Sequence, residues 1–71
     1  MITERFLVPE VSCQHCVNAV TKEVSALPDI QHVQVNLTDK TVTVEHGEQV
    51  DTDAIIAAIN EAGYDEVTRL S

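Results

Sequence analysis

The sequence predicts an α+β fold in which a four-stranded antiparallel sheet carries two helices on one face. Two kinds of pattern predict it. Short runs alternate apolar and polar residues, which is typical of half-buried strands, and longer runs repeat apolar residues every three or four positions, which is typical of amphipathic helices. The 71 residues are enough to bury only about 60% of the surface that the unfolded chain exposes. We therefore expect one domain, covering residues 1–71, with a thin core.

The first strand and the first helix lie in the N-terminal third of the chain. Residues 3–8 have the alternating sequence TERFLV, and Pro9 ends the strand because it cannot donate a ladder hydrogen bond. A helix is predicted from about Cys16 to Leu27, where apolar residues recur at spacings of three, four and three. Pro28 ends it, since proline cannot continue the helical hydrogen bonds. The apolar stripe of this helix comprises Val17, Val20, Val24 and Leu27.

Two alternating segments follow the first helix. Residues 30–37 (IQHVQVNL) and residues 41–46 (TVTVEH) are separated by residues 38–40, which supply a turn, and this arrangement predicts an antiparallel hairpin. The predicted core is formed by the apolar faces of the strands and helices. Its members are Phe6, Val8, Val17, Val20, Val24, Val33, Val35, Val42, Val44, Ile55 and Ile59.

The second helix and the last strand complete the pattern. The helix is expected over residues 51–62, with Asp51 or Thr52 as its cap and Gly63 just after its end. Residues 66–70 (EVTRL) leave room for a final strand. The order strand, helix, strand, strand, helix, strand corresponds to the ferredoxin-like βαββαβ sandwich, in which each helix connects two parallel strands.

The charge of the chain excludes several classes of partner. Twelve acidic and four basic residues give a net charge of −8, which would repel nucleic acid and anionic lipid. The acidic residues, Glu4 among them, are scattered and expected at the solvated surface. No apolar run approaches the roughly 20 residues of a membrane span, and residues 1–5 lack the features of a signal peptide. We therefore expect a cytoplasmic protein without membrane insertion.

Cys13 and Cys16 are the only two cysteines, and they lie where the first helix is expected to begin. Backbone N–H groups at a helix start lack helical partners and, with the helix dipole, favour thiolate over thiol. The three-residue spacing lets both sulfurs reach one ion. Four interpretations compete: a structural disulfide, a structural zinc site, a thiol–disulfide oxidoreductase, and an open site for a soft metal ion such as Cu(I).

The rest of the sequence favours the open metal site. A disulfide would close only a short loop and contribute little stability. Structural zinc normally needs four ligands, whereas His32 and His46 are expected to be solvated surface residues. The oxidoreductase interpretation stays open as an alternative, although no proline separates the cysteines. Thiolates select Cu(I), and a site with two ligands leaves room for a partner's thiolate to attack. Such ligand exchange needs no catalytic residue, so we do not expect an enzyme.

Together these residues resemble the heavy-metal-associated (HMA) domain family, especially bacterial copper chaperones of the CopZ type. The resemblance covers almost the whole chain and depends on VSCQHC at residues 11–16 and AGYDEV at residues 62–67. It implies that Cys13 and Cys16 bind Cu(I) and pass it to the metal-binding domain of a copper-transporting P-type ATPase or to another thiolate acceptor. The alternatives are a metal-binding domain cut from such an ATPase, mercury binding and general metal buffering. Two chains could also share copper as a homodimer.

The resemblance also concerns residues around the cysteines. It puts Tyr64 near the metal, although this ring could equally cover a small core. His15 is expected to be exposed beside the site, and Ser12 keeps a hydroxyl close to Cys13. The family usually has methionine two residues before the first cysteine, where this chain has Val11. We expect Val11 to replace the apolar contact with less volume, which affects loop rigidity more than metal binding.

Overall fold

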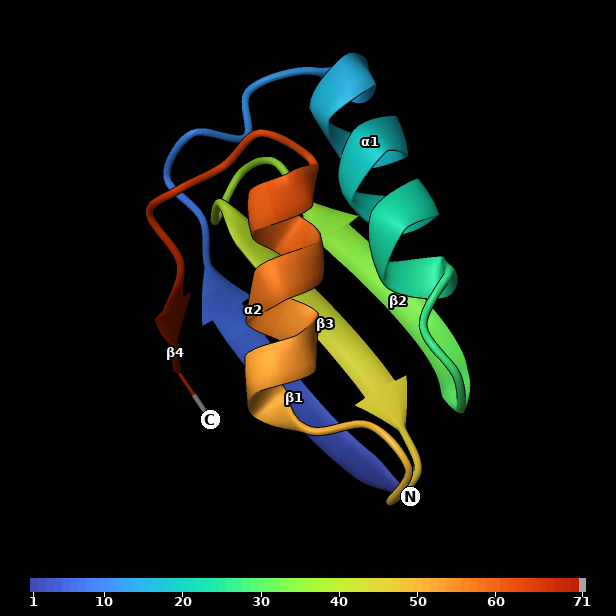
Figure 1. Cartoon of the computed structure of the whole chain (residues 1–71). Coiled ribbons are helices and arrows are strands. Elements are labelled where there is room, and N and C mark those ends of the chain that lie inside the picture. Colours follow the sequence, from blue (N-terminus) through green and yellow to red (C-terminus); the bar gives the residue numbers. More distant parts are fainter. Residues whose placement is uncertain (71) are drawn as a thin grey trace.

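Four strands form one sheet in the order β2-β3-β1-β4, and every neighbouring pair is antiparallel. The computed structural model describes residues 1–70, and Figure 1 shows both helices on the same face of the sheet. This arrangement confirms the predicted ferredoxin-like fold. Neither helix in the described part of the chain is long and apolar enough to span a bilayer. The elements are β1 (Ile2–Leu7), α1 (Gln14–Ser25), β2 (Ile30–Asn36), β3 (Thr41–His46), α2 (Thr52–Glu61) and β4 (Thr68–Arg69).

The observed boundaries differ most from the predicted ones at the start of α1 and in β4. Helix α1 begins at Gln14 rather than near Cys16, because its first turn lies ahead of the apolar stripe and gives no periodic signal. Strand β4 has two residues and pairs only with the end of β1. At α2 the predicted signals are confirmed: the Asp51 side chain accepts a hydrogen bond from the Ala54 N–H, and Gly63 has a φ of 107°, a conformation that glycine adopts freely.

The hydrophobic core lies between the sheet and the two helices. The prediction was wrong for Val17, which is only half-buried in the first turn of α1. Val33 and Val35 are also half-buried but pack against the core from β2. Val11 is buried in a loop, in keeping with the apolar contact expected there from the family resemblance, whereas Val50 was missed because it lies in a loop and belongs to no periodic segment. The buried apolar side chains are Phe6, Val8, Val11, Val20, Val24, Val42, Val44, Val50, Ile55, Ala58 and Ile59.

Two charged residues that were expected at the surface are buried instead. Glu4 is 2% exposed and His46 is 1% exposed. Both positions follow from the register of the strands, in which Glu4 pairs with Val44 and Phe6 pairs with Val42. Because alternate residues of a strand share a face, Glu4 points toward the helices with Phe6, and His46 does so with Val44.

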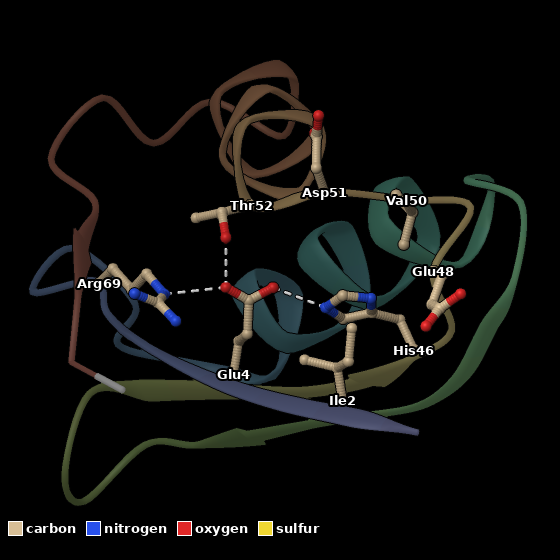
Figure 2. Close-up of a pocket in the computed structure, with 8 residues that line it drawn as sticks. All are labelled: Ile2, Glu4, His46, Glu48, Val50, Asp51, Thr52 and Arg69. Carbon is tan, nitrogen blue, oxygen red and sulfur yellow. Dashed lines mark hydrogen bonds and ion pairs between the residues drawn. The ribbon is translucent and has the colours of Figure 1, made fainter.

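The buried Glu4 carboxylate accepts hydrogen bonds from three other elements (Figure 2). Its Oε2 lies 2.5 Å from His46 Nε2 on β3, and its Oε1 lies 2.8 Å from Arg69 Nε on β4 and also accepts from the Thr52 hydroxyl on α2. His46 Nδ1 is 2.7 Å from the Gly47 carbonyl oxygen. Each ring nitrogen thus lies within hydrogen-bond distance of an oxygen atom. Burial alone would raise the pKa of Glu4, but these hydrogen bonds lower it below its ordinary value of 4.5.

The Glu4 cluster lines a cavity of about 340 Å³ beside the start of α2. Figure 1 places the turn before α2 at one end of the sheet and the loop between β1 and α1, which carries Cys13, at the other end. Throughout residues 1–70, every buried side-chain nitrogen or oxygen has a hydrogen-bond partner. The polar groups of this cavity therefore bind one another and serve the fold rather than the cysteine site.

Replacing Glu4 with glutamine should destabilise the protein. The substitution removes the charge of a buried carboxylate that accepts hydrogen bonds from three side chains, so we expect the free energy of unfolding near neutral pH to fall by roughly 2–4 kcal/mol. The ionised carboxylate contributes stability above its ordinary pKa of 4.5, and this contribution is lost as the pH falls through the lowered pKa of the folded state. The difference in the free energy of unfolding between the wild type and Glu4→Gln should therefore become smaller in acid. Urea denaturation of both proteins at several pH values measures this difference.

Glu48→Gln is the matched control, because Glu48 lines the same cavity but is exposed. It should change stability by no more than about 0.5 kcal/mol, as is usual at exposed positions. Equal losses for the two variants, or a difference that widens in acid, would contradict the role assigned to the Glu4 carboxylate.

Candidate metal centre

The loop between β1 and α1 is fixed to the core at two of its residues. The side chains of Val8 and Val11 are fully buried, and the Val11 N–H donates to the Val8 carbonyl at 3.2 Å, closing a turn over Pro9 and Glu10. Beyond Val11, Ser12 and Cys13 are exposed. The loop thus presents Cys13 to solvent just after an anchored residue.

The start of α1 is arranged to favour negative charge. Cys13 is the N-cap residue in an extended conformation, and its carbonyl accepts from the N–H groups of Cys16 and Val17 at 3.0 and 3.2 Å. Among residues 1–70, no side chain caps this helix start, and its first turn contains no acidic residue. Helix α2 differs, because the Asp51 carboxylate occupies its N-terminus. The N–H groups and the dipole of α1 are therefore available to the cysteine sulfurs.

The two cysteine sulfurs lie 3.7 Å apart. Both cysteines are free, with Cys13 exposed and Cys16 half-buried. This separation far exceeds the disulfide bond length of about 2.05 Å. Two sulfurs so placed can hold one ion with metal–sulfur bonds of about 2.3 Å, the length seen with zinc. In the described residues, no three His, Cys, Asp or Glu side chains come together in a way that could hold a metal ion, so this chain offers the ion a pair of sulfurs.

Tyr64 and the backbone stabilise the thiolate of Cys16. The Tyr64 hydroxyl, which can donate a hydrogen bond to the sulfur, is the main cause that lowers the pKa of Cys16 from 9.0 to about 6, and the N–H groups of Ser12 and Cys13 add to it. The same interaction raises the pKa of Tyr64 to about 12. The half-buried Tyr64 side chain also packs against the core. Tyr64 thus covers the core and acts on the sulfur at once.

The structure also locates the other residues that the sequence suggested as ligands or neighbours of the metal site. His15 and His32 are exposed, as expected. Ser12 is exposed and acts on Cys16 through its backbone N–H. The surface assignment of His46 was wrong, because this ring is buried against Glu4 at the other end of the sheet.

Sequence reasoning missed one residue that contacts the loop. Lys40, at the end of the turn between β2 and β3, donates from Nζ to the Val11 carbonyl oxygen at 2.8 Å. Lys40 and Val11 are 29 positions apart in the chain. No periodic pattern or short motif links residues so distant, so the sequence contained no signal for this contact.

Comparisons with known proteins agree with the geometry. The sequence pattern of the heavy-metal-associated domain family matches residues 5–65. The chain is 41% identical over 59 residues to the copper chaperone CopZ of Bacillus subtilis, covering 82% of this chain and 86% of that protein. It is 33% identical over 63 residues to copper-transporting ATPase 2 of Rhizobium meliloti. That match covers 89% of this chain, which spans only about 8% of the length of the ATPase.

A solved structure shows the same fold in a related protein. The solution structure of apo-CopP from Helicobacter pylori superimposes with a TM-score of 0.85 at 31% sequence identity. The alignment covers 94% of this chain and 100% of that one. The likeness therefore extends over the sheet, both helices and the loop with the cysteines.

The ionisation of Cys16 can be tested in the reduced, metal-free protein. Because its pKa is lowered to about 6, the rate of alkylation of Cys16 by iodoacetamide should rise with pH to a midpoint near that value. Tyr64→Phe keeps the ring and removes the hydroxyl, so the midpoint should move up by roughly one pH unit. Mass spectrometry of the digested protein resolves the modified position.

His32→Gln serves as the control, since it changes an exposed histidine on β2 and should leave the midpoint of Cys16 alkylation unchanged. A wild-type midpoint close to 9.0, the ordinary value for cysteine, would show that the Cys16 thiolate is not stabilised. An unchanged midpoint in Tyr64→Phe would remove Tyr64 as its cause.

Proposed function

The chain belongs to the heavy-metal-associated domain family, and on that premise we propose that it is a copper chaperone that carries Cu(I) between Cys13 and Cys16. The observation that carries this proposal is the pair of free sulfurs 3.7 Å apart at an exposed helix start. The proposal takes residues 1–71 as one such domain, with Ser12, His15 and Tyr64 surrounding the ligands.

The chemistry of the two ligands supports Cu(I) as the cargo. Thiolates are soft donors that prefer Cu(I) to hard cations. Zinc in structural sites takes four protein ligands, whereas the described residues bring two sulfurs together without a third His, Cys, Asp or Glu. The lowered pKa of Cys16 keeps this ligand mostly deprotonated at neutral pH, so a proton competes only weakly with the metal for this sulfur.

Ligand exchange supplies the transfer step. A thiolate of the acceptor forms a third bond to copper, after which one cysteine of the carrier leaves and a second acceptor thiolate replaces the other. Copper keeps its charge throughout, and the displaced thiolates either remain ionised or take up protons from water. Exposure of Cys13 gives the incoming thiolate access to the ion. No acid, base or redox residue is required, and the protein acts as a carrier rather than as an enzyme.

The acceptor we propose is the metal-binding domain of a copper-transporting P-type ATPase or another thiolate site. Relatives named as copper-transporting ATPases contain a segment similar to this chain, and two similar domains can each offer a cysteine pair. Transfer would occur in the cytoplasm, where thiols stay reduced. Two copies of this chain could also hold copper between four cysteines as a homodimer.

A second candidate is that the chain is itself a metal-binding domain of such an ATPase. The same similarity favours it, because nearly the whole chain matches a small part of those proteins. The cysteine site would then load copper onto a transporter of which it is part. The two candidates share the site and differ in whether copper leaves the polypeptide.

Copper binding provides the direct test. The reduced protein should bind about one Cu(I) per chain, since both thiolates serve one ion. Replacing both Cys13 and Cys16 with serine should weaken binding by more than the ~10- to 100-fold typical of losing a residue that merely supports a ligand. Competition with a Cu(I)-specific chelator measures the affinity, and mixing the loaded protein with an apo ATPase domain measures transfer.

His32→Gln is again the matched control, because His32 is an exposed histidine on β2, and this variant should bind Cu(I) like the wild type. Tight binding by the double serine variant would rule out the cysteine site. Preference for Zn(II) over Cu(I) at cellular availability would change the proposed cargo, and rapid metal-free reduction of insulin disulfides would favour an oxidoreductase instead.

A further inference from the structure

Lys40 contacts both ends of the turn that precedes the cysteine site. Its carbonyl oxygen accepts from the Val8 N–H at 2.8 Å, and its Nζ donates to the Val11 carbonyl oxygen at 2.8 Å. Val8 and Val11 are themselves joined by the hydrogen bond that closes this turn. One residue of the neighbouring hairpin thus holds the loop at the point where it leaves the sheet and at the last buried residue before the cysteines.

We propose that Lys40 is a positioning residue for the metal site, which sets where Cys13 lies relative to Cys16 by fixing the carbonyl of Val11. The proposal builds on the proposed function and assigns Lys40 a part in it. Cys16 lies within α1, and the exposed Cys13 is tied to the same helix through its carbonyl oxygen, which accepts from the N–H groups of Cys16 and Val17. On its N-terminal side, the position of Cys13 depends on the residues just before it, of which Val11 is the anchored one.

The bond from Lys40 is suited to this role. A hydrogen bond from an ammonium group is stronger than one between neutral groups, and the contact is partly buried.

The backbone of Lys40 supports a role for its side chain. Its φ of 61° lies in the left-handed region, which is uncommon for a residue with a long side chain and is adopted most readily by glycine. The backbone conformation alone would favour glycine at this position. Lysine contributes the one group that glycine lacks, the ammonium that reaches Val11.

Three variants of Lys40 separate its positioning role from general stability. Lys40→Met keeps most of the stem but removes the donor, and we expect it to weaken Cu(I) binding about tenfold, as loss of a residue supporting a metal ligand commonly does. Lys40→Arg keeps a charged donor and should restore the affinity to within about twofold. Lys40→Gly should bind Cu(I) as weakly as Lys40→Met while unfolding at a higher temperature than that variant, because glycine relieves the left-handed backbone.

Lys22→Met is the matched control, since it removes an exposed lysine from the last turn of α1, and it should bind Cu(I) like the wild type. Affinity is measured by chelator competition with Cu(I), and thermal unfolding is followed in the metal-free proteins. Amide hydrogen exchange at Ser12 and Cys13, also without metal, should be faster in Lys40→Met and Lys40→Gly than in the wild type.

Wild-type Cu(I) affinity in both Lys40→Met and Lys40→Gly would overturn the proposal. So would an affinity that falls only in proportion to the loss of thermal stability across the variants. If the wild-type protein binds no Cu(I), the proposed function fails. The amide exchange at Ser12 and Cys13 then still decides whether Lys40 fixes the loop, and unchanged exchange in the Lys40 variants would refute it.

Discussion

The buried carboxylate of Glu4 is the interaction on which this arrangement of elements most depends. A domain of 71 residues has little apolar surface to bury, and β4 adds only two paired residues. The carboxylate accepts from His46 on β3, Thr52 on α2 and Arg69 on β4, so one group on β1 joins three other elements. Hydrogen bonds to a buried charge depend on direction as well as distance, whereas apolar contacts are non-directional. The cluster therefore specifies how α2 and β4 sit against the sheet.

The hydrogen bonds of the Glu4 cluster are separated in space from the cysteines. The Glu4 cluster lies beside the turn before α2, and the loop that presents Cys13 lies at the other end of the sheet (Figure 1). At that end the anchoring stops at Val11, and Cys13 stays exposed while Cys16 is half-buried at the helix start. A site formed by one fixed and one accessible sulfur can bind an ion and still admit a competing ligand. A fully enclosed site would bind the ion without releasing it.

Residues with a local pattern could be predicted from the sequence, and residues fixed by distant contacts could not. Alternation predicted the sheet, helical spacing predicted both helices, and the cysteine spacing predicted the paired sulfurs. The burial of Glu4 was missed for a different reason. Glu4 alternates with Phe6, which indicates an inward-facing side chain, but an acidic residue is expected at the surface because burying a charge is costly. That cost is offset by Arg69 and His46, which lie far along the chain. Lys40 had no local signal at all, since its role depends on where the hairpin turn packs.

The ionisation of Cys16 bears on release as well as on binding. With its pKa lowered to about 6, the Cys16 thiol is mostly deprotonated at neutral pH, so in the proposed function a proton would rarely compete with copper for this sulfur. Its lowered basicity also makes it a weaker donor and a better leaving group than an ordinary cysteine. In the proposed transfer, the Tyr64 hydroxyl would favour exchange over retention, because it lowers the pKa of Cys16 and so stabilises the thiolate that the metal leaves behind. When the acceptor is a similar pair of thiolates, the exchange is close to balanced in free energy, and net movement of copper depends on what the acceptor does with it next.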